Sequence, residues 1–201
     1  QQQRVALARA LVAEPKVILF DEPLSNLDAK LREETRKALE RFLGELGITA
    51  VYVTHDRVEA LALSDSIAVM RAGRIVEIGS PQRIYFDART RFVADFIGRA
   101  NLVPATVRAA EGNELVVDSA LGPLRCARRD PVRLGEATLC IRPEFMHLRP
   151  GEGEPAPNRV RGRIESLAFV GEFYEAQMRV GDTLLLARTE PEVELRVGDA
   201  V

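Results

Sequence analysis

The sequence predicts an α/β domain followed by a mostly β domain, and three observations support this prediction. Helical and strand-like patterns alternate over residues 4–63, which is typical of a parallel sheet. Short strand-like segments separated by turns fill residues 101–201, as in small β barrels. The pattern changes near residue 100, so we expect one domain over residues 1–100 and a second over residues 101–201.

The composition is that of an ordinary globular protein. Of the 201 residues, 46% are hydrophobic and 29% are charged, and the formal net charge is −2. This balance argues against a nucleic-acid partner. No apolar run reaches about 18 residues, so we expect no membrane span. Cys126 and Cys140 lack the spacing of a metal site or a disulfide framework, which favours two reduced thiols in a cytosolic setting.

The first domain is expected to run helix, strand, helix, strand, helix. The continuous apolar run 17–20 is typical of a parallel strand that is buried on both faces. Pro15 ends the helix before it, and Gly47 ends the long amphipathic helix after it. The five elements are expected over residues 4–14, 17–20, about 27–46, 48–53 and a short stretch after residue 56.

Hairpins and short strands are expected in the rest of the chain. Residues 67–78 predict a β-hairpin, and Ser80-Pro81 is a typical start of a helix. Another helix is expected to end at Gly98. The second domain is predicted to be an OB-like small barrel. Its strands are expected at residues 102–108, 114–118, 138–142, 160–170, 173–180 and 183–188.

Two carboxylates end the first predicted strand. Asp21 and Glu22 follow Phe20 at the carboxyl edge of the predicted parallel sheet, where ligands of open α/β sheets bind. One carboxylate of such a pair can hold a hydrated Mg²⁺ beside phosphates, and the other can accept a proton from water. An acidic, solvated turn is the alternative explanation, because many strands end in one.

His55 follows the second predicted strand and is expected to meet the same edge. It is a candidate contact for the same phosphate, and the alternative explanation is a solvated or hydrogen-bonded side chain, which is usual for a lone histidine at the end of a strand. The segment from Ser25 to Asp28 precedes the long helix. Ordinary helix capping is the alternative explanation for these small polar residues.

Taken together in their order along the chain, three segments resemble motifs of the ABC-transporter ATPase family. QQQRVALARAL is similar to the end of the family's signature motif, VILFDEPLSNLDAKLR to its Walker B strand and D-loop, and VTHD to its switch histidine. The resemblance continues through MRAGRIVEIGSPQRIYFDARTRFVADFIG. Residues 141–144 look like the TOBE domain that follows the ATPase in many importers. The resemblance thus covers essentially the whole chain.

The resemblance implies part of a P-loop NTPase-type ATPase domain and a role for each matched residue. Glu22 would be the general base that polarises the attacking water, and His55 would contact the γ-phosphate. Asp21 would help to hold Mg²⁺, largely through water. Gln1 would be the last residue of the signature motif, and Asp28 would face the partner's nucleotide site. Both are therefore expected to contribute to ATP binding.

The resemblance also implies partners and a location. ATP and Mg²⁺ would be the cofactors of the intact protein. A second ATPase subunit in a homodimer and transmembrane permease subunits would be its partners. The protein would act at the cytoplasmic face of the membrane, with no nucleic-acid partner. The tail is similar to importers of several solutes, and polyamine or ferric iron is the preferred cargo.

The sequence departs from the family at the phosphate-binding loop. No G-x-x-x-x-G-K-S/T motif occurs, and none of Lys16, Lys30 and Lys37 follows a glycine-rich loop. We expect both ends to be truncated, with Gln1 inside the signature motif. The chain by itself is therefore expected not to hydrolyse ATP. The alternative function is an ATP-independent dimerisation or regulatory module that binds a small ligand through the TOBE-like domain.

Overall fold

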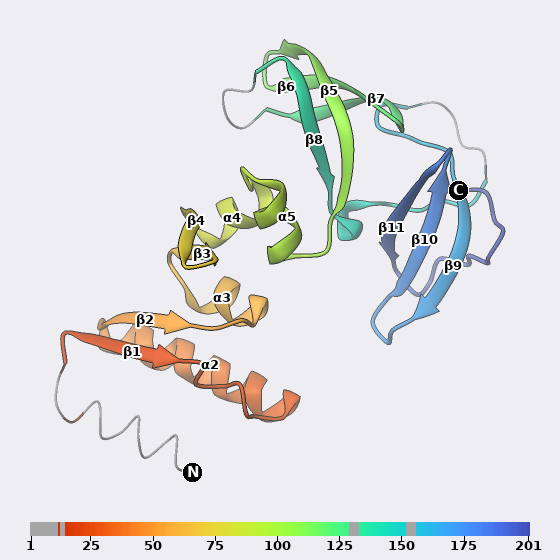
Figure 1. Ribbon diagram of the computed structural model, residues 1–201. Coiled ribbons are helices and arrows are strands. Elements are labelled where there is room, and N and C mark those ends of the chain that lie inside the picture. The colour runs from red at the N-terminus through yellow and green to blue at the C-terminus, as the bar shows by residue number, and fades with distance from the viewer. Residues whose placement is uncertain (1–11, 13–14, 129–132, 152–155) are drawn as a thin grey trace. The chain divides into compact units, whose positions relative to one another are not determined.

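The computed structural model describes residues 12, 15–128, 133–151 and 156–201 (Figure 1). The chain divides into two compact units, one up to Ala88 and one from Arg89 onward. Gln1 and nearly all of the helix predicted over residues 4–14 lie outside the described residues. Within the described part of the chain, no helix combines the length and apolar character needed to span a membrane.

The first unit contains a parallel strand pair, as the alternating pattern predicts. β1 and β2 run parallel, with Val17 opposite Thr49 and Asp21 opposite Val53. The long helix α2 connects them and ends at Gly47, whose φ of 60° suits a glycine. The elements of this unit are β1 (Val17–Asp21), α2 (Ala29–Leu46), β2 (Thr49–Val53), α3 (Arg57–Leu63), β3 (Ile67–Arg71), β4 (Arg74–Gly79) and α4 (Pro81–Phe86).

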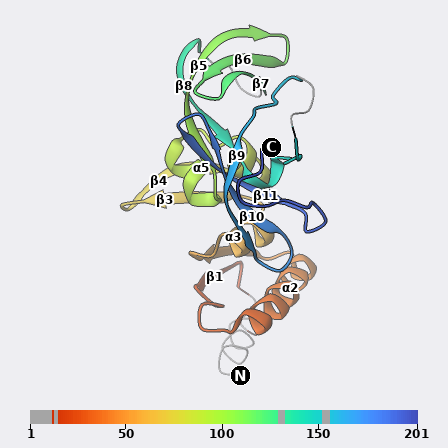
Figure 2. The same cartoon turned by 90° about the vertical axis from the view of Figure 1, so that its right-hand side faces the viewer.

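Only one face of the β1–β2 pair is covered among the described residues. Ile18 and Phe20 are buried against Leu39 of α2, which runs beside the strands in both views (Figure 2). Val17 and Leu19, on the other face, are 54% and 67% exposed. The prediction that residues 17–20 are buried on both faces is therefore wrong for this structure. Side chains alternate between the faces of a strand, and the packing comes from one side.

The hairpin and the helix start predicted after residue 66 are both confirmed. β3 and β4 are antiparallel, and Ala72 and Gly73 form their turn with positive φ angles of 49° and 74°. Ser80 caps α4 by accepting a hydrogen bond from the Arg83 amide, and Pro81 occupies the first turn.

In its described residues, the second unit contains the helix α5, the short 3₁₀ helix η1 and two antiparallel sheets. The strand orders are β7-β6-β5-β8 and β11-β10-β9. The sequence prediction missed β7. The elements are α5 (Arg91–Ile97), β5 (Asn101–Glu111), β6 (Glu114–Ser119), β7 (Gly122–Ala127), β8 (Gly135–Ile141), the short 3₁₀ helix η1 (Pro143–Phe145), β9 (Arg163–Phe169), β10 (Tyr174–Val180) and β11 (Thr183–Thr189).

The two sheets share one hydrophobic core. Val103 and Val117 of the four-stranded sheet belong to the same buried cluster as Ile164 and Leu185 of the three-stranded sheet. The buried side chain of Asn101 joins the sheets directly, because it exchanges hydrogen bonds with the backbone of Leu186. Apolar burial and a satisfied polar contact thus hold the sheets together.

The predicted OB-like barrel is not a closed barrel in the described residues. The described strands form two separate ladders, and an isolated bridge joins Arg163, at the start of β9, to Ala200. The segment between β8 and β9 contains Pro143, Pro150 and Pro157, which have no N–H to donate to a ladder. These prolines disfavour a continuous ladder from β8 to β9, and the two strands belong to different sheets.

The two cysteines lie in the four-stranded sheet of this unit. Cys126 in β7 and Cys140 in β8 are both free thiols, as the sequence predicts. Desolvation raises the pKa of each thiol, which disfavours the reactive thiolate.

Candidate functional site

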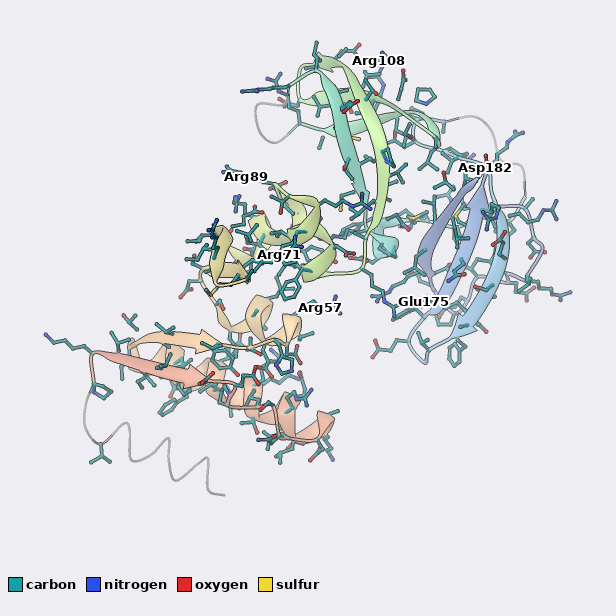
Figure 3. The ribbon with its side chains drawn as sticks, viewed as in Figure 1. Arg57, Arg71, Arg89, Arg108, Glu175 and Asp182 are labelled. Carbon is teal, nitrogen blue, oxygen red and sulfur yellow. The ribbon has the colours of Figure 1, made fainter. Side chains whose placement is uncertain are left out.

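The ends of β1 and β2 bring the candidate residues of the first unit to one edge. Because the strands are parallel and in register, the turns that follow Asp21 and Val53 begin side by side. The Glu22 amide donates a 2.9 Å hydrogen bond to the Val53 carbonyl and so joins the two turns. This edge lies next to the start of α3, where Figure 3 labels Arg57.

Glu22 is held in an unusual backbone conformation. Its φ is 45°, in the left-handed region that a side chain with a Cβ seldom occupies. The amide and the hydroxyl of Ser25 both donate to the Glu22 carbonyl, so hydrogen bonds on both sides maintain this conformation. Strained residues of this kind cluster at functional sites, where the surrounding structure keeps a side chain in a defined position.

Glu22 and His55 lie at the same edge, as their places after the two strands predict, and the structure brings their side chains into contact. Nδ1 of His55 lies 2.9 Å from Oε1 of Glu22. An ionised carboxylate can only accept, so Nδ1 carries the proton and Nε2 is left for a ligand. The hydrogen bond and charge of Glu22 raise the pKa of His55 above its usual value. Both side chains are largely exposed and therefore accessible to a ligand.

Asp21 offers a single exposed carboxylate at the end of β1. No cluster of three His, Cys, Asp or Glu side chains suited to a metal occurs among the described residues. These donors are too few for a metal site in which every ligand comes from the protein. They do fit Mg²⁺, which binds through one or two carboxylates together with water and the phosphates of a substrate.

Asp28 acts as the cap of α2. Its carboxylate accepts a 3.0 Å hydrogen bond from the Leu31 amide, and its backbone is extended, as in an N-cap. The capping explanation raised by the sequence is thus confirmed. The further role of Asp28 toward a partner's nucleotide stays a prediction. Gln1, which was expected to contribute to ATP binding, lies outside the described residues.

Sequence reasoning missed a buried carboxylate beneath the His55 turn. Glu59 of α3 is 3% exposed. Its Oε2 accepts hydrogen bonds from the hydroxyls of Tyr52 and Thr54, at 2.9 and 2.8 Å. Burial and the nearby Glu59 carboxylate raise the pKa of Tyr52. The spacing of Asp56 and Glu59, an N-cap followed three residues later by Glu, is the signal that could have drawn attention to this pair.

Arg32 was also missed, and it links the two turns of this edge. Its guanidinium donates a 2.9 Å hydrogen bond to the Leu27 carbonyl, in the turn before α2. The same group lies 3.7 Å from the carboxylate of Asp56, which follows His55. One side chain therefore contacts both the segment that ends at Asp28 and the segment that carries His55.

Comparisons with known proteins point to one group of relatives. Residues 139–201 match the family model described as the TOBE domain. The spermidine/putrescine import ATP-binding protein PotA of Pseudomonas fluorescens is 44% identical over 197 residues, which cover 96% of this chain and 52% of the relative. The Fe(3+) ions import ATP-binding protein FbpC of Agrobacterium fabrum is 44% identical over 188 residues, covering 92% of this chain and 52% of the relative. The chain thus spans about half the length of these curated relatives.

Proposed function

The chain belongs to the ATP-binding subunits of ABC importers, and we propose from this premise that its first unit contributes the hydrolytic edge of an ATPase that powers solute uptake. The contact between Glu22 and His55 carries the proposal. It joins a carboxylate and an imidazole at the carboxyl edge of a parallel strand pair, where phosphate ligands of α/β proteins bind.

In the proposed reaction, Glu22 is the general base. Its carboxylate accepts a proton from water while the water oxygen forms a bond to the γ-phosphorus of ATP. The bond from that phosphorus to the bridging oxygen breaks, which leaves ADP and inorganic phosphate. The strained backbone of Glu22 holds the carboxylate in place for this step.

His55 is proposed to contact the γ-phosphate through Nε2. Glu22 occupies Nδ1 and raises the pKa of the ring, so a larger fraction of His55 is protonated near neutral pH. A protonated ring donates from Nε2 and stabilises the charge that develops on the phosphate oxygens. The geometry therefore suits His55 to this role.

Asp21 is proposed as the Mg²⁺ ligand, largely through water. The ion would neutralise phosphate charge when bound. Asp28 and Gln1 are proposed to contribute to ATP binding in a head-to-tail homodimer. Transmembrane permease subunits are the proposed partners, at the cytoplasmic face of the membrane. The two relatives described above are named for spermidine/putrescine and for Fe(3+), and a cargo of one of these two classes is proposed.

ATP turnover tests the proposal. In a chimera, residues 1–201 replace the matching part of the Pseudomonas fluorescens relative, which supplies the other half of its length. We expect this chimera to hydrolyse ATP. The Glu22→Gln variant should still bind ATP but turn it over about 10²–10⁴-fold more slowly, because it lacks the proton acceptor. The matched control is Glu34→Gln, which changes an exposed carboxylate of α2.

Two results would contradict the proposal. One is normal turnover by the Glu22→Gln chimera, and the other is equal loss in the Glu34→Gln control. The isolated chain provides a separate test, because it has no Walker A motif and is proposed not to hydrolyse ATP. Uptake of labelled putrescine and of Fe³⁺ by cells that depend on the chimera would then identify the cargo class.

A further inference from the structure

Glu59 is a buried acid in the first unit to which the proposed reaction assigns no role. Burial of an ionised carboxylate is costly unless hydrogen bonds compensate for the lost water. Here two hydroxyl donors meet the same oxygen of Glu59. An apolar side chain at this position of α3 would avoid that cost. A role in holding its hydroxyl donors therefore explains the presence of Glu59 better than packing does.

Thr54 is the group that Glu59 holds next to His55. The Thr54 hydroxyl has one proton, and it donates this proton to Glu59. The same oxygen accepts a 2.9 Å hydrogen bond from the amide of Asp56, on the other side of His55. One hydroxyl thus binds the chain across His55, and its direction is set by the buried carboxylate.

The other end of this turn is also anchored to α3. The Asp56 carboxylate caps the helix by accepting from the amides of Val58 and Glu59, at 2.8 and 3.4 Å. Hydrogen bonds therefore hold the backbone before and after His55. The imidazole itself is exposed, and its one side-chain hydrogen bond in the described residues is the contact with Glu22. Its position depends on the backbone that carries it.

We propose that Glu59 is a positioning residue for His55, acting through the Thr54 hydroxyl to hold the imidazole against Glu22. The consequence of this positioning for ATP turnover rests on the proposed function. A catalytic group displaced by about 1 Å loses up to about 100-fold in rate, so a buried hydrogen bond that sets the His55 backbone has a measurable effect.

The first experiment uses residues 1–201 and does not depend on ATP. Two-bond ¹H–¹⁵N NMR spectra of the imidazoles identify the nitrogen that carries the proton, and the chain has only two histidines. In the wild type, we expect His55 to be protonated at Nδ1. In Thr54→Val, which has nearly the same shape but no hydroxyl, the signal of His55 protonated at Nδ1 should weaken, because this form is the one that donates to Glu22. Glu59→Ala should give the same result, and Glu59→Gln should keep the signal because its amide oxygen still accepts.

Tyr52→Phe is the matched control. It removes the other donor to Glu59 and leaves the Thr54 hydrogen bond intact. If Tyr52→Phe and Thr54→Val weaken the His55 signal equally, general disturbance around a buried acid explains the effect and the proposal is wrong. An unchanged signal in Thr54→Val overturns it as well. Thr54→Val keeps the proposal testable if Glu59→Ala fails to fold.

The second experiment measures turnover in the chimera. We expect Glu59→Ala and Thr54→Val to lower kcat about 10- to 100-fold with little change in KM for ATP, and Glu59→Gln to restore most of the rate. In the His55→Ala background, Glu59→Ala should cause no further loss. A further loss of the same size would show that Glu59 acts independently of His55. A chimera that hydrolyses no ATP would contradict the proposed function, while the NMR result would still decide the positioning role.

Discussion

Nδ1 of His55 lies 2.9 Å from the carboxylate of Glu22, although 33 positions separate the two residues in the chain. The parallel pairing of β1 and β2 makes this contact, because it places the ends of both strands at one edge. The contact links the candidate base to the candidate phosphate ligand. It also makes the charge of His55 dependent on Glu22.

This dependence predicts a pH effect. The hydrogen bond and charge of Glu22 raise the pKa of His55 in the folded chain. In the unfolded chain, the pKa of a histidine is about 6.5. While Glu22 is ionised, the contact therefore stabilises the fold fully below the unfolded pKa and loses this effect as pH rises through the folded pKa. An NMR titration should show a raised midpoint for His55 and a lower one in Glu22→Gln. Equal midpoints in the two proteins would contradict the contact.

Substitutions of Asp28 test its structural role as the cap of α2 separately from its proposed role in ATP binding. We expect Asp28→Ala to lower the free energy of unfolding by about 0.5–2 kcal/mol, because the first turn of α2 loses its cap. Asp28→Asn should retain most of the stability, since Asn caps helices about as well as Asp. Urea unfolding followed by circular dichroism measures both. If Asn destabilises as much as Ala, the carboxylate has a role beyond capping in the isolated chain.

Neighbouring residues of β1 should respond very differently to truncation. Ile18 is 6% exposed and packs on α2, so Ile18→Ala should cost about 2–5 kcal/mol. Leu19 is 67% exposed on the opposite face, and Leu19→Ala should change stability by no more than about 0.5 kcal/mol. Urea unfolding of the two variants provides the comparison. A large loss in Leu19→Ala would show that the exposed face is covered in solution.

Asn101 should be a strong determinant of stability in the second unit. Its side chain donates to the carbonyls of Ile141 and Leu186 and accepts from the Leu186 amide. Asn101→Ala leaves buried backbone groups without these partners, at a cost of about 1–3 kcal/mol. Hydrogen exchange at the Leu186 amide should accelerate. Asn113→Ala, at an exposed turn, is the control and should leave this amide protected.

Local patterns in the sequence predicted most of the elements. The stripe over residues 27–46 matches α2 closely, and Gly47 ends it because a left-handed residue is needed there. The hairpin over 67–78 was predicted in the same way. Each depends on residues a few positions apart. β7 was missed because Gly122 and Pro123 are poor strand formers, and its pairing with β6 overrides that local preference.

By itself, the sequence determined most of the helices and strands and the placement of Asp21, Glu22 and His55 after two strands of one sheet. Spacing along the chain carries this information. The tertiary structure alone decided that Glu22 and His55 touch, that Glu59 is buried beneath Thr54, and that one face of β1 is covered. These properties depend on which distant segments pack together, and that packing sets the burial and the partner of each polar group.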